Sequence, residues 1–263
     1  MTAYDLLLGH FGPQNWWPAE TPFEVALGAI LTQQVSWRNV EQAINNLKRL
    51  GLLDPQKIRS LPLETLEDLI RPTGFYKTKA KKVKAFVDFL CERYDGSMDT
   101  MFKTPPEDLR KALLSVYGIG PETADSILLY AGGVPVFVVD AYTLRLLERF
   151  DLQGNDLTYE RVQSLFQAAL PRDATLFNEF HALIVALCKN ICRLSDPKCK
   201  ICPVVRICSY GRRVSYRGGE SETGDTASLP KGSSDTKSLP KRRLSKRRRR
   251  ANAARMAPCE GAM

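Results

Sequence analysis

Four cysteines near the end of the sequence have the spacing of a metal site. Cys192, Cys199, Cys202 and Cys208 form the pattern C-x6-C-x2-C-x5-C within 17 residues. Thiolates this close together are ligands for zinc and equally for an iron–sulfur cluster, and their number alone does not separate the two. Disulfides are not expected in a reducing compartment. A bound metal would also fold a loop that has no apolar core of its own.

Asp140 is a second group that could do chemistry. It ends the apolar run VPVFVVD (134–140) and directly precedes a segment with helical spacing. Its simplest role is to cap that helix. If a fold held the same carboxylate at the mouth of a cleft, it could stabilise a cationic transition state or activate water.

The segment SVYGIGPETADSILLYA (115–131) predicts a helix, a tight hairpin and a second helix. Gly118 should end the first helix, and Pro121 suits the first turn of the second. Gly118 and Gly120 would let the backbone turn sharply and approach another molecule closely. Backbone N–H groups at a helix start lack internal partners and favour a phosphate. The hairpin could therefore hold a nucleic-acid backbone, and a plain turn between two helices is the alternative.

The elements that must position these groups are predicted to be helices. Leucine and isoleucine recur at helical spacing over residues 61–70, and apolar residues do so over 109–116. Proline and glycine separate such segments. Only VPVFVVD has the composition of a strand, and it could equally be an extended lead into the next helix. We therefore expect an all-α fold over residues 20–210.

Composition limits the class of protein. At 44% hydrophobic residues a sizeable core can form, yet no apolar run approaches the roughly 18–20 residues of a membrane span. The first residues lack the features of a secretory signal, so we expect a soluble, cytoplasmic protein. Residues 211–263 hold 14 Lys and Arg against 5 Asp and Glu, which accounts for the whole net charge of +9. This segment is predicted to be a disordered basic tail that either binds polyanions or is passive.

The hairpin, Asp140 and the cysteine loop, in this order and spacing, resemble the endonuclease III (HhH-GPD) superfamily of DNA glycosylases over about residues 4–208. The resemblance implies that Asp140 is the catalytic aspartate and that the four cysteines hold a [4Fe–4S] cluster. It implies two helical domains with a DNA-binding cleft between them. One would span 22–134, and the other would combine 1–21 with 135–210. The partner would be double-stranded DNA with a damaged base, and we expect a monomer.

One position departs from part of this superfamily. Bifunctional members carry a hairpin lysine that forms a Schiff base with the sugar and then cleaves the strand. The matching residue here is Glu122, and a carboxylate cannot form an imine. This predicts a monofunctional enzyme that removes a base and leaves an abasic site.

The N-terminal half resembles the 3-methyladenine DNA glycosylase III branch in WWP (16–18) and in the segments 23–37 and 70–83. The similarity implies a base pocket that also includes Glu122 and is shaped by Trp16, Trp17, Pro18 and Trp37. Aromatic faces attract a cationic methylated purine by ~0.5–2 kcal/mol. Core packing is the simpler role for the tryptophans. The cluster is not a fixed feature of this branch, so the substrate class stays open.

Further DNA contacts follow from the same resemblance. Gln34 matches a glutamine that fills the hole left by a flipped base, and Phe75 matches an apolar wedge that kinks DNA. Lys77 and Lys79 begin a run of lysines that could hold phosphates or form a solvated helix face. Ile119, between the hairpin glycines, is grouped with Gly118 and Gly120 as a contact to the backbone.

Three other functions fit parts of this pattern. One is a bifunctional glycosylase and lyase for oxidised pyrimidines, with an amine supplied from elsewhere in the chain. Another is a DNA protein that binds lesions without catalysis, although such a protein gains little from a carboxylate near phosphates. The last is an iron–sulfur electron carrier, which the hairpin makes a poor description of the main role.

Overall fold

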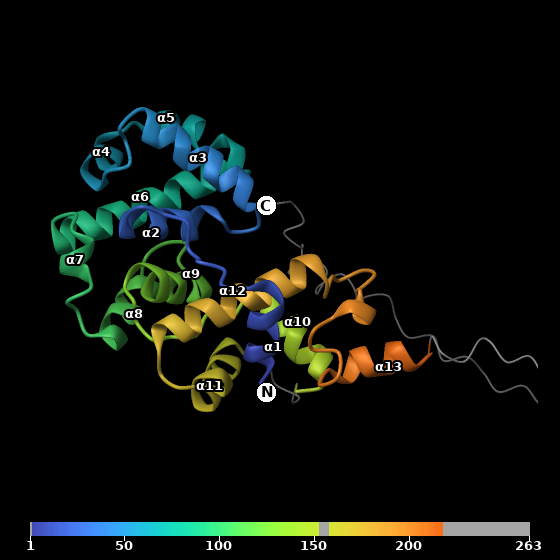
Figure 1. The fold of residues 1–263 in the computed structure, drawn as a ribbon. Coiled ribbons are helices and arrows are strands. Elements are labelled where there is room, and N and C mark those ends of the chain that lie inside the picture. Colours follow the sequence, from blue (N-terminus) through green and yellow to red (C-terminus); the bar gives the residue numbers. More distant parts are fainter. Residues whose placement is uncertain (1, 153–157, 218–263) are drawn as a thin grey trace, which may run out of the picture.

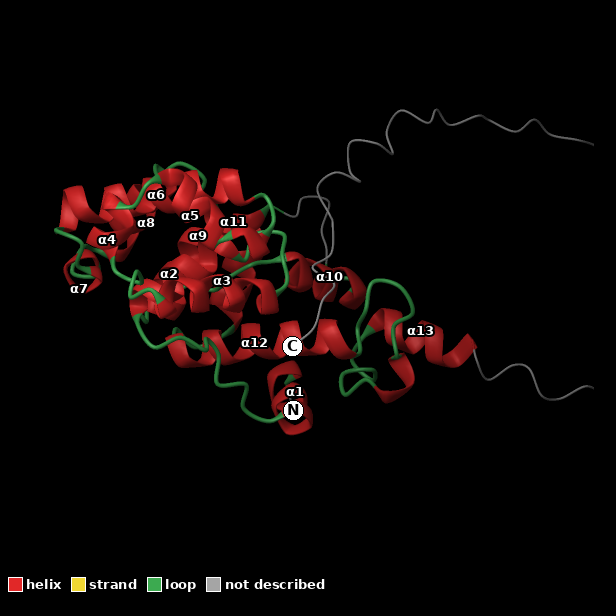
Figure 2. Cartoon of the chain, turned by 90° about the horizontal axis from the view of Figure 1, so that it is seen from above, coloured by secondary structure: helices red, strands yellow, loops and turns green. Residues whose placement is uncertain are grey.

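The computed structural model describes residues 2–152 and 158–217. Over these residues the chain forms helices and connecting loops, with no β-strand (Figures 1 and 2). The all-α prediction is therefore confirmed. The basic run KRRLSKRRRR lies outside the described residues.

The helices between residues 22 and 131 occupy the top and left of Figure 1. Among them α2 is buried at every position from Phe23 to Leu31. In chain order these elements are α2 (Pro22–Leu31), α3 (Trp37–Arg49), α4 (Pro55–Ser60), α5 (Leu63–Leu69), the 3-10 turn η1 (Arg71–Thr73), α6 (Tyr76–Tyr94), α7 (Met98–Met101), α8 (Pro106–Leu114), α9 (Pro121–Ser126) and the π-helical turn η2 (Ile127–Ala131).

The remaining helices bring the start and the end of the described chain together. Both α1 and α10 pack against the long helix α12 (Figure 1). The N-terminal helix and the C-terminal helices therefore pack together in one helical bundle. The division into domains at residues 22 and 134 stays a prediction. These elements are α1 (Ala3–Phe11), α10 (Ala141–Phe150), α11 (Tyr159–Ala169), α12 (Ala174–Asn190), the 3-10 turn η3 (Cys199–Ile201) and α13 (Ser209–Arg217).

Local residues explain where several helices begin. Thr21 and Asp54 accept a hydrogen bond from the backbone N–H of the third residue in α2 and α4, as good N-caps do. Pro22, Pro55 and Pro121 stand in first turns, where a missing N–H costs nothing. These caps and prolines set where the short helices around α2 and α6 begin.

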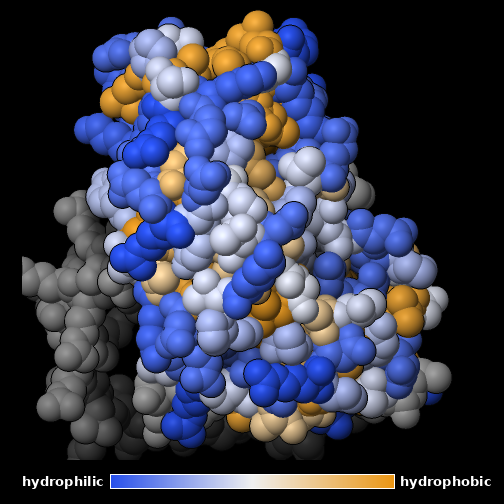
Figure 3. Space-filling view, turned by 90° about the vertical axis from the view of Figure 1, so that its left-hand side faces the viewer, coloured by the Kyte–Doolittle hydropathy of each residue, from blue (hydrophilic) through white to orange (hydrophobic). Residues whose placement is uncertain are grey.

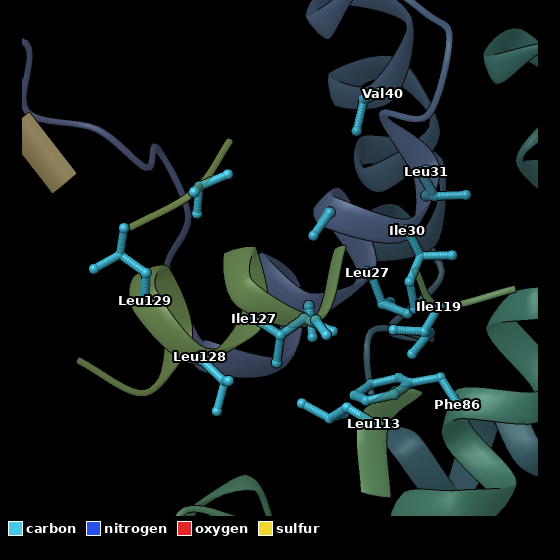
Figure 4. Close-up of a cluster of buried hydrophobic side chains, with 14 of the residues drawn as sticks. Leu27, Ile30, Leu31, Val40, Phe86, Leu113, Ile119, Ile127, Leu128 and Leu129 are labelled. Carbon is cyan, nitrogen blue, oxygen red and sulfur yellow. The ribbon is translucent and has the colours of Figure 1, made fainter. Parts of the chain in front are cut away.

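The hairpin is anchored to the hydrophobic core by Ile119, the residue at its tip. Figure 4 shows Ile119 pointing among Leu27 and Ile30 of α2, Phe86 of α6 and Leu113 of α8. Only 5% of Ile119 is exposed. Burying such a side chain contributes roughly 1.5–3 kcal/mol to the stability of the fold. The Ile119 side chain therefore fixes the hairpin to the hydrophobic core.

A buried polar network joins the hairpin to the segment that ends at Asp140. Arg110 of α8 bonds both oxygens of Asp125 of α9, at 2.7 and 3.0 Å. Gln163 of α11 donates to Asp125 at 2.7 Å and to the Phe137 carbonyl at 2.7 Å. Because the Asp125 carboxylate is fully buried, its position is strongly specified by these partners. The network therefore fixes where the extended lead into α10 runs.

Three expectations about elements need correction or completion. The first hairpin helix, α8, ends at Leu114 rather than Gly118, and the residues between them form turns. The run 134–140 is an extended lead and not a strand. The predicted tail begins too early, since α13 continues to Arg217. Gly211 is buried against Cys208, and the Arg213 guanidinium lies 2.9 Å from the Asp151 carboxylate.

None of the described helices has the length and apolar character needed to cross a bilayer. Figure 3 shows the side of the molecule at the left of Figure 1, where hydrophilic residues predominate and hydrophobic ones lie in small patches.

Candidate active site

A large open cleft brings the hairpin, Asp140 and an aromatic cluster together. Its empty volume is about 1970 Å³ when the open solvent at its mouth is included. Eight of the residues predicted from the sequence line it: Trp16, Trp17, Gln34, Trp37, Gly118, Gly120, Glu122 and Asp140. They come from segments up to 124 positions apart in the sequence, so only the folded chain assembles them.

Asp140 uses its two carboxylate oxygens differently. Oδ1 accepts hydrogen bonds from the Thr143 backbone N–H at 2.8 Å and from the Thr143 hydroxyl at 2.9 Å, which caps α10. Oδ2 lies 3.6 Å from Nε2 of His181. Burial alone would raise the pKa of this carboxyl, but His181 and the bonds from Thr143 outweigh it and lower the pKa. Asp140 is therefore ionised at neutral pH beside the cleft.

His181 and Tyr130 are cleft residues that the sequence analysis missed. His181 lies in α12 and is 5% exposed. The hydroxyl of Tyr130 is 2.5 Å from its Nδ1. Burial first, then the charges of Asp140 and Glu122, raise the pKa of Tyr130 well above its usual value. The only local indication was a histidine inside the apolar run FHALIVALC.

Aromatic rings form one wall of the cleft. The Trp16 and Trp17 rings are stacked at an angle of 28° with centroids 5.9 Å apart, and Trp17 meets Trp37 edge to face at 5.1 Å. Trp16 also stacks on Tyr130 with 6.3 Å between centroids. Aromatic faces of this kind can stack on another planar ring. Pro18 is exposed and does not line the cleft, contrary to its predicted place in the pocket.

Glu122 lies inside the cleft at the start of α9. Its side chain is exposed to the open cleft. The surrounding walls still remove much of its bulk solvation, and the charge of Asp140 adds to this effect, so the pKa rises to about 7 despite an opposing influence of His181. The two carboxyls of the cleft thus differ in charge near neutral pH.

The hairpin backbone is held against Lys82 and Gln33. Gly118 has φ +82°, and a Cβ there would lie 2.5 Å from Cδ of Lys82. The amide of Gln33 donates to the Gly118 carbonyl at 3.2 Å and to the Thr123 hydroxyl at 3.0 Å, while Lys82 donates to Gln33. By contrast, a Cβ at Gly120 would meet no atom within 4 Å. Since the Ile119 side chain is buried, only its backbone could contact DNA.

The residues predicted to contact DNA outside the hairpin differ in accessibility. Phe75 is 71% exposed and has φ +45°, and Gln34 is exposed at φ +57°. Lys77 is exposed. Lys79 does not fit its predicted role, because it is 3% exposed and its ammonium donates to the carbonyls of Leu31 and Thr73 at 2.8 and 2.7 Å. It joins the end of α2 to the turn before α6.

The four predicted metal ligands line a second, smaller cavity. Cys192, Cys199, Cys202 and Cys208 all line it. Arg149 donates to the Cys192 sulfur at 2.9 Å. A hydrogen bond with Cys188 and the nearby Arg149 lower the pKa of the Cys192 thiol to about 6 against the effect of burial.

The four thiols are a donor set that suits either zinc or an iron–sulfur cluster. In the described part of the chain, no set of three or more His, Cys, Asp or Glu side chains is grouped closely enough to hold a single metal ion.

Comparisons with known proteins show the family of this chain. Residues 27–172 match the model of the HhH-GPD superfamily base excision DNA repair proteins. The chain belongs to this superfamily. A protein of Methanocaldococcus jannaschii carries the provisional name of DNA repair glycosylase. It is 48% identical to this chain over 207 residues, which cover 78% of this chain and 93% of that protein.

Two solved structures share the fold. A trapped covalent complex of endonuclease III with DNA has a TM-score of 0.70 at 23% identity, over 81% of this chain and 95% of the other. The Helicobacter pylori 3-methyladenine DNA glycosylase bound to 1,N6-ethenoadenine has a TM-score of 0.60 at 28% identity, over 70% and 96%. Fold, cleft and family together identify a DNA glycosylase of the HhH-GPD superfamily.

Proposed function

We propose that this DNA glycosylase is monofunctional and hydrolyses the N-glycosidic bond of alkylated purines such as 3-methyladenine in duplex DNA. The observation that carries the proposal is the cleft itself, in which stacked tryptophans lie beside the ionised Asp140. A methylated purine is cationic, and aromatic faces attract cations. Such a base is also a good leaving group, so one well-placed carboxylate suffices for the chemistry.

The H. pylori glycosylase supports the substrate class. It is named for 3-methyladenine and holds a modified adenine in its structure. Its likeness to this chain covers most of both proteins. The aromatic wall formed by Trp16, Trp17 and Tyr130 offers ring faces on which a base of that kind can stack.

The proposed reaction begins with extrusion of the damaged nucleotide. Backbone amides of the hairpin and the exposed Lys77 hold phosphates, while Phe75 and Gln34 stabilise the kinked duplex. The base enters the aromatic cleft. Asp140 Oδ2 then stabilises the positive charge that develops on the sugar and orients the water that attacks the anomeric carbon. The glycosidic bond breaks and an abasic site remains.

The cysteine cavity is proposed to hold a [4Fe–4S] cluster through Cys192, Cys199, Cys202 and Cys208. When bound, the cluster would supply a rigid cross-link for a loop with little core of its own. That loop carries Arg193, Lys198, Lys200 and Arg206, whose charges would face phosphates once the loop is fixed.

A bifunctional glycosylase and lyase is the second candidate. Lys82 lines the cleft, and burial lowers the pKa of its amine, which favours a nucleophile. Against this, the amine is engaged with Gln33, and Glu122 occupies the position of the lysine that bifunctional members use.

One experiment separates these candidates. Purified protein is incubated with duplexes that carry 3-methyladenine, 7-methylguanine, hypoxanthine, uracil or thymine glycol, and free base and strand breaks are counted separately. We expect free methylated purine and intact abasic strands. Strand breaks together with a borohydride-trapped protein–DNA adduct, lost in Lys82→Ala, would establish the bifunctional enzyme instead.

A further inference from the structure

Three side chains from distant parts of the sequence form a line that ends at the proposed catalytic carboxylate. Tyr130 lies in η2, His181 in α12 and Asp140 at the start of α10. The Tyr130 hydroxyl is 2.5 Å from Nδ1 of His181, and His181 Nε2 is 3.6 Å from Asp140 Oδ2. All three line the cleft.

The direction of the hydrogen bonds follows from the inventory of donors and acceptors. Tyr130 keeps its proton at neutral pH, because its environment disfavours the phenolate. In a neutral imidazole, whose donor and acceptor roles depend on the tautomer, Nδ1 can therefore accept from this hydroxyl. The ring proton is left on Nε2, on the side that faces Asp140.

The Nε2 group has a specific reason to approach Asp140. It is buried without a hydrogen-bond partner in the described part of the chain. A buried N–H without a hydrogen-bond partner destabilises the folded protein. Oδ2 is the nearby oxygen left free by the helix cap, since Oδ1 already accepts both bonds from Thr143. Hydrogen bonds of this kind are often long in a free enzyme and shorten when substrate binds.

We propose that Tyr130 and His181 are positioning residues that orient the Asp140 carboxylate for the glycosylase reaction. The Tyr130 hydroxyl holds the imidazole by Nδ1, and Nε2–H, 3.6 Å from Oδ2 in the free enzyme, closes on one of its lone pairs when substrate binds. The other lone pair is left for the sugar or the attacking water. Thr143 fixes one oxygen of the carboxylate and His181 fixes the other, so the group cannot rotate away from the cleft.

The inference rests on the proposed function for its effect on rate, but its geometry can be tested without substrate. The sequence has two histidines, His10 and His181, and His10 is exposed in α1. Long-range ¹⁵N–¹H NMR of the holoprotein reports which ring nitrogen carries the proton, and His10→Gln assigns the resonances. We expect the Nε2–H form for His181, with an Nδ1 shift that changes in Tyr130→Phe. A proton on Nδ1 would overturn the proposal even if no alkylated base were excised.

The kinetic test replaces His181 by two amide side chains of different length, glutamine and asparagine. His181→Gln places an amide near the position of Nε2, whereas His181→Asn places it near Nδ1, away from Asp140. We expect the single-turnover excision rate to fall about 10- to 100-fold in His181→Asn and less in His181→Gln. The affinity for duplex containing a stable abasic analogue should stay unchanged in both.

Tyr130→Phe is a second variant that should still fold, because it removes only an oxygen atom. We expect its excision rate to fall with DNA affinity preserved, while the melting temperature falls only slightly, because Nδ1 of His181 loses its partner. If His181→Asn and Tyr130→Phe both turned over at the rate of the unmodified protein, the positioning role would be disproved. If the unmodified protein excised no alkylated purine, the proposed function would fail while the NMR result still decided the geometry.

Discussion

At the level of single residues, the two oxygens of Asp140 separate a structural role from a chemical one. Oδ1 caps α10 through Thr143, while Oδ2 lies toward His181 at the cleft. Asn is as good an N-cap as Asp, so the substitution Asp140→Asn should keep the helix start and remove the negative charge.

We therefore expect Asp140→Asn to lower the single-turnover excision rate by about 10²–10³-fold, with the affinity for lesion-containing duplex largely retained. Rates come from quenched excision assays and affinities from fluorescence anisotropy. Thermal unfolding of the variant should match that of the unmodified protein. Excision at an undiminished rate would remove Asp140 from the mechanism.

Glu122 should make activity depend on pH. Its pKa is raised to about 7, so the carboxyl is mostly protonated below pH 7 and mostly ionised above it. The ionised form attracts a cationic base, so excision of a methylated purine should increase as pH rises from 6 to 8. The pH–rate profile of Glu122→Gln should lack this rise. An identical rise in that variant would assign it to another group.

At the level of elements, the hairpin contains two glycines with different reasons to be glycine. Gly118 has φ +82° and is covered by the Lys82 side chain, whereas Gly120 faces open space at φ −95°. The first is therefore required by the fold. The second is free of the protein and, in the proposed complex, close to a phosphate.

Alanine at each position should give opposite results. Gly118→Ala should lower the free energy of unfolding by at least about 1–2 kcal/mol, because a Cβ disfavours this backbone conformation. Gly120→Ala should change it by less than about 1 kcal/mol, yet weaken DNA binding about tenfold, equivalent to about 1.4 kcal/mol. Chemical denaturation and anisotropy titrations measure the two effects. Unchanged DNA affinity in Gly120→Ala would exclude close approach of DNA at the hairpin tip.

At the level of the whole molecule, the cysteine cavity joins α10, the end of α12 and α13. The holoprotein should contain about four iron atoms and matching sulfide per chain. Cys202→Ala should lose the iron, lower the melting temperature and expose residues 192–208 to proteases. Cys91→Ala, whose thiol is buried in α6 outside this cavity, should keep the iron. About one zinc per chain and no iron would contradict the cluster.

The sequence by itself determined the features that depend on neighbouring residues. Asp140 was predicted to cap a helix that begins at Ala141, and it does. The cysteine spacing predicted that four thiols would lie together, and all four line one cavity. The all-α class followed from apolar spacing and from proline and glycine between helices. These features are local, because caps, turns and metal loops form among residues close in the chain.

Only the tertiary structure decided features that depend on burial and on contacts between distant segments. Lys79 belongs to a run of lysines, yet its ammonium is enclosed and satisfied by two carbonyls. Pro18 adjoins two cleft tryptophans but faces solvent. Tyr130 and His181 are 51 positions apart, and nothing in either local sequence requires them to meet. Which side of a helix is covered, and by what, depends on how all the helices pack together, and this determines which residues reach Asp140.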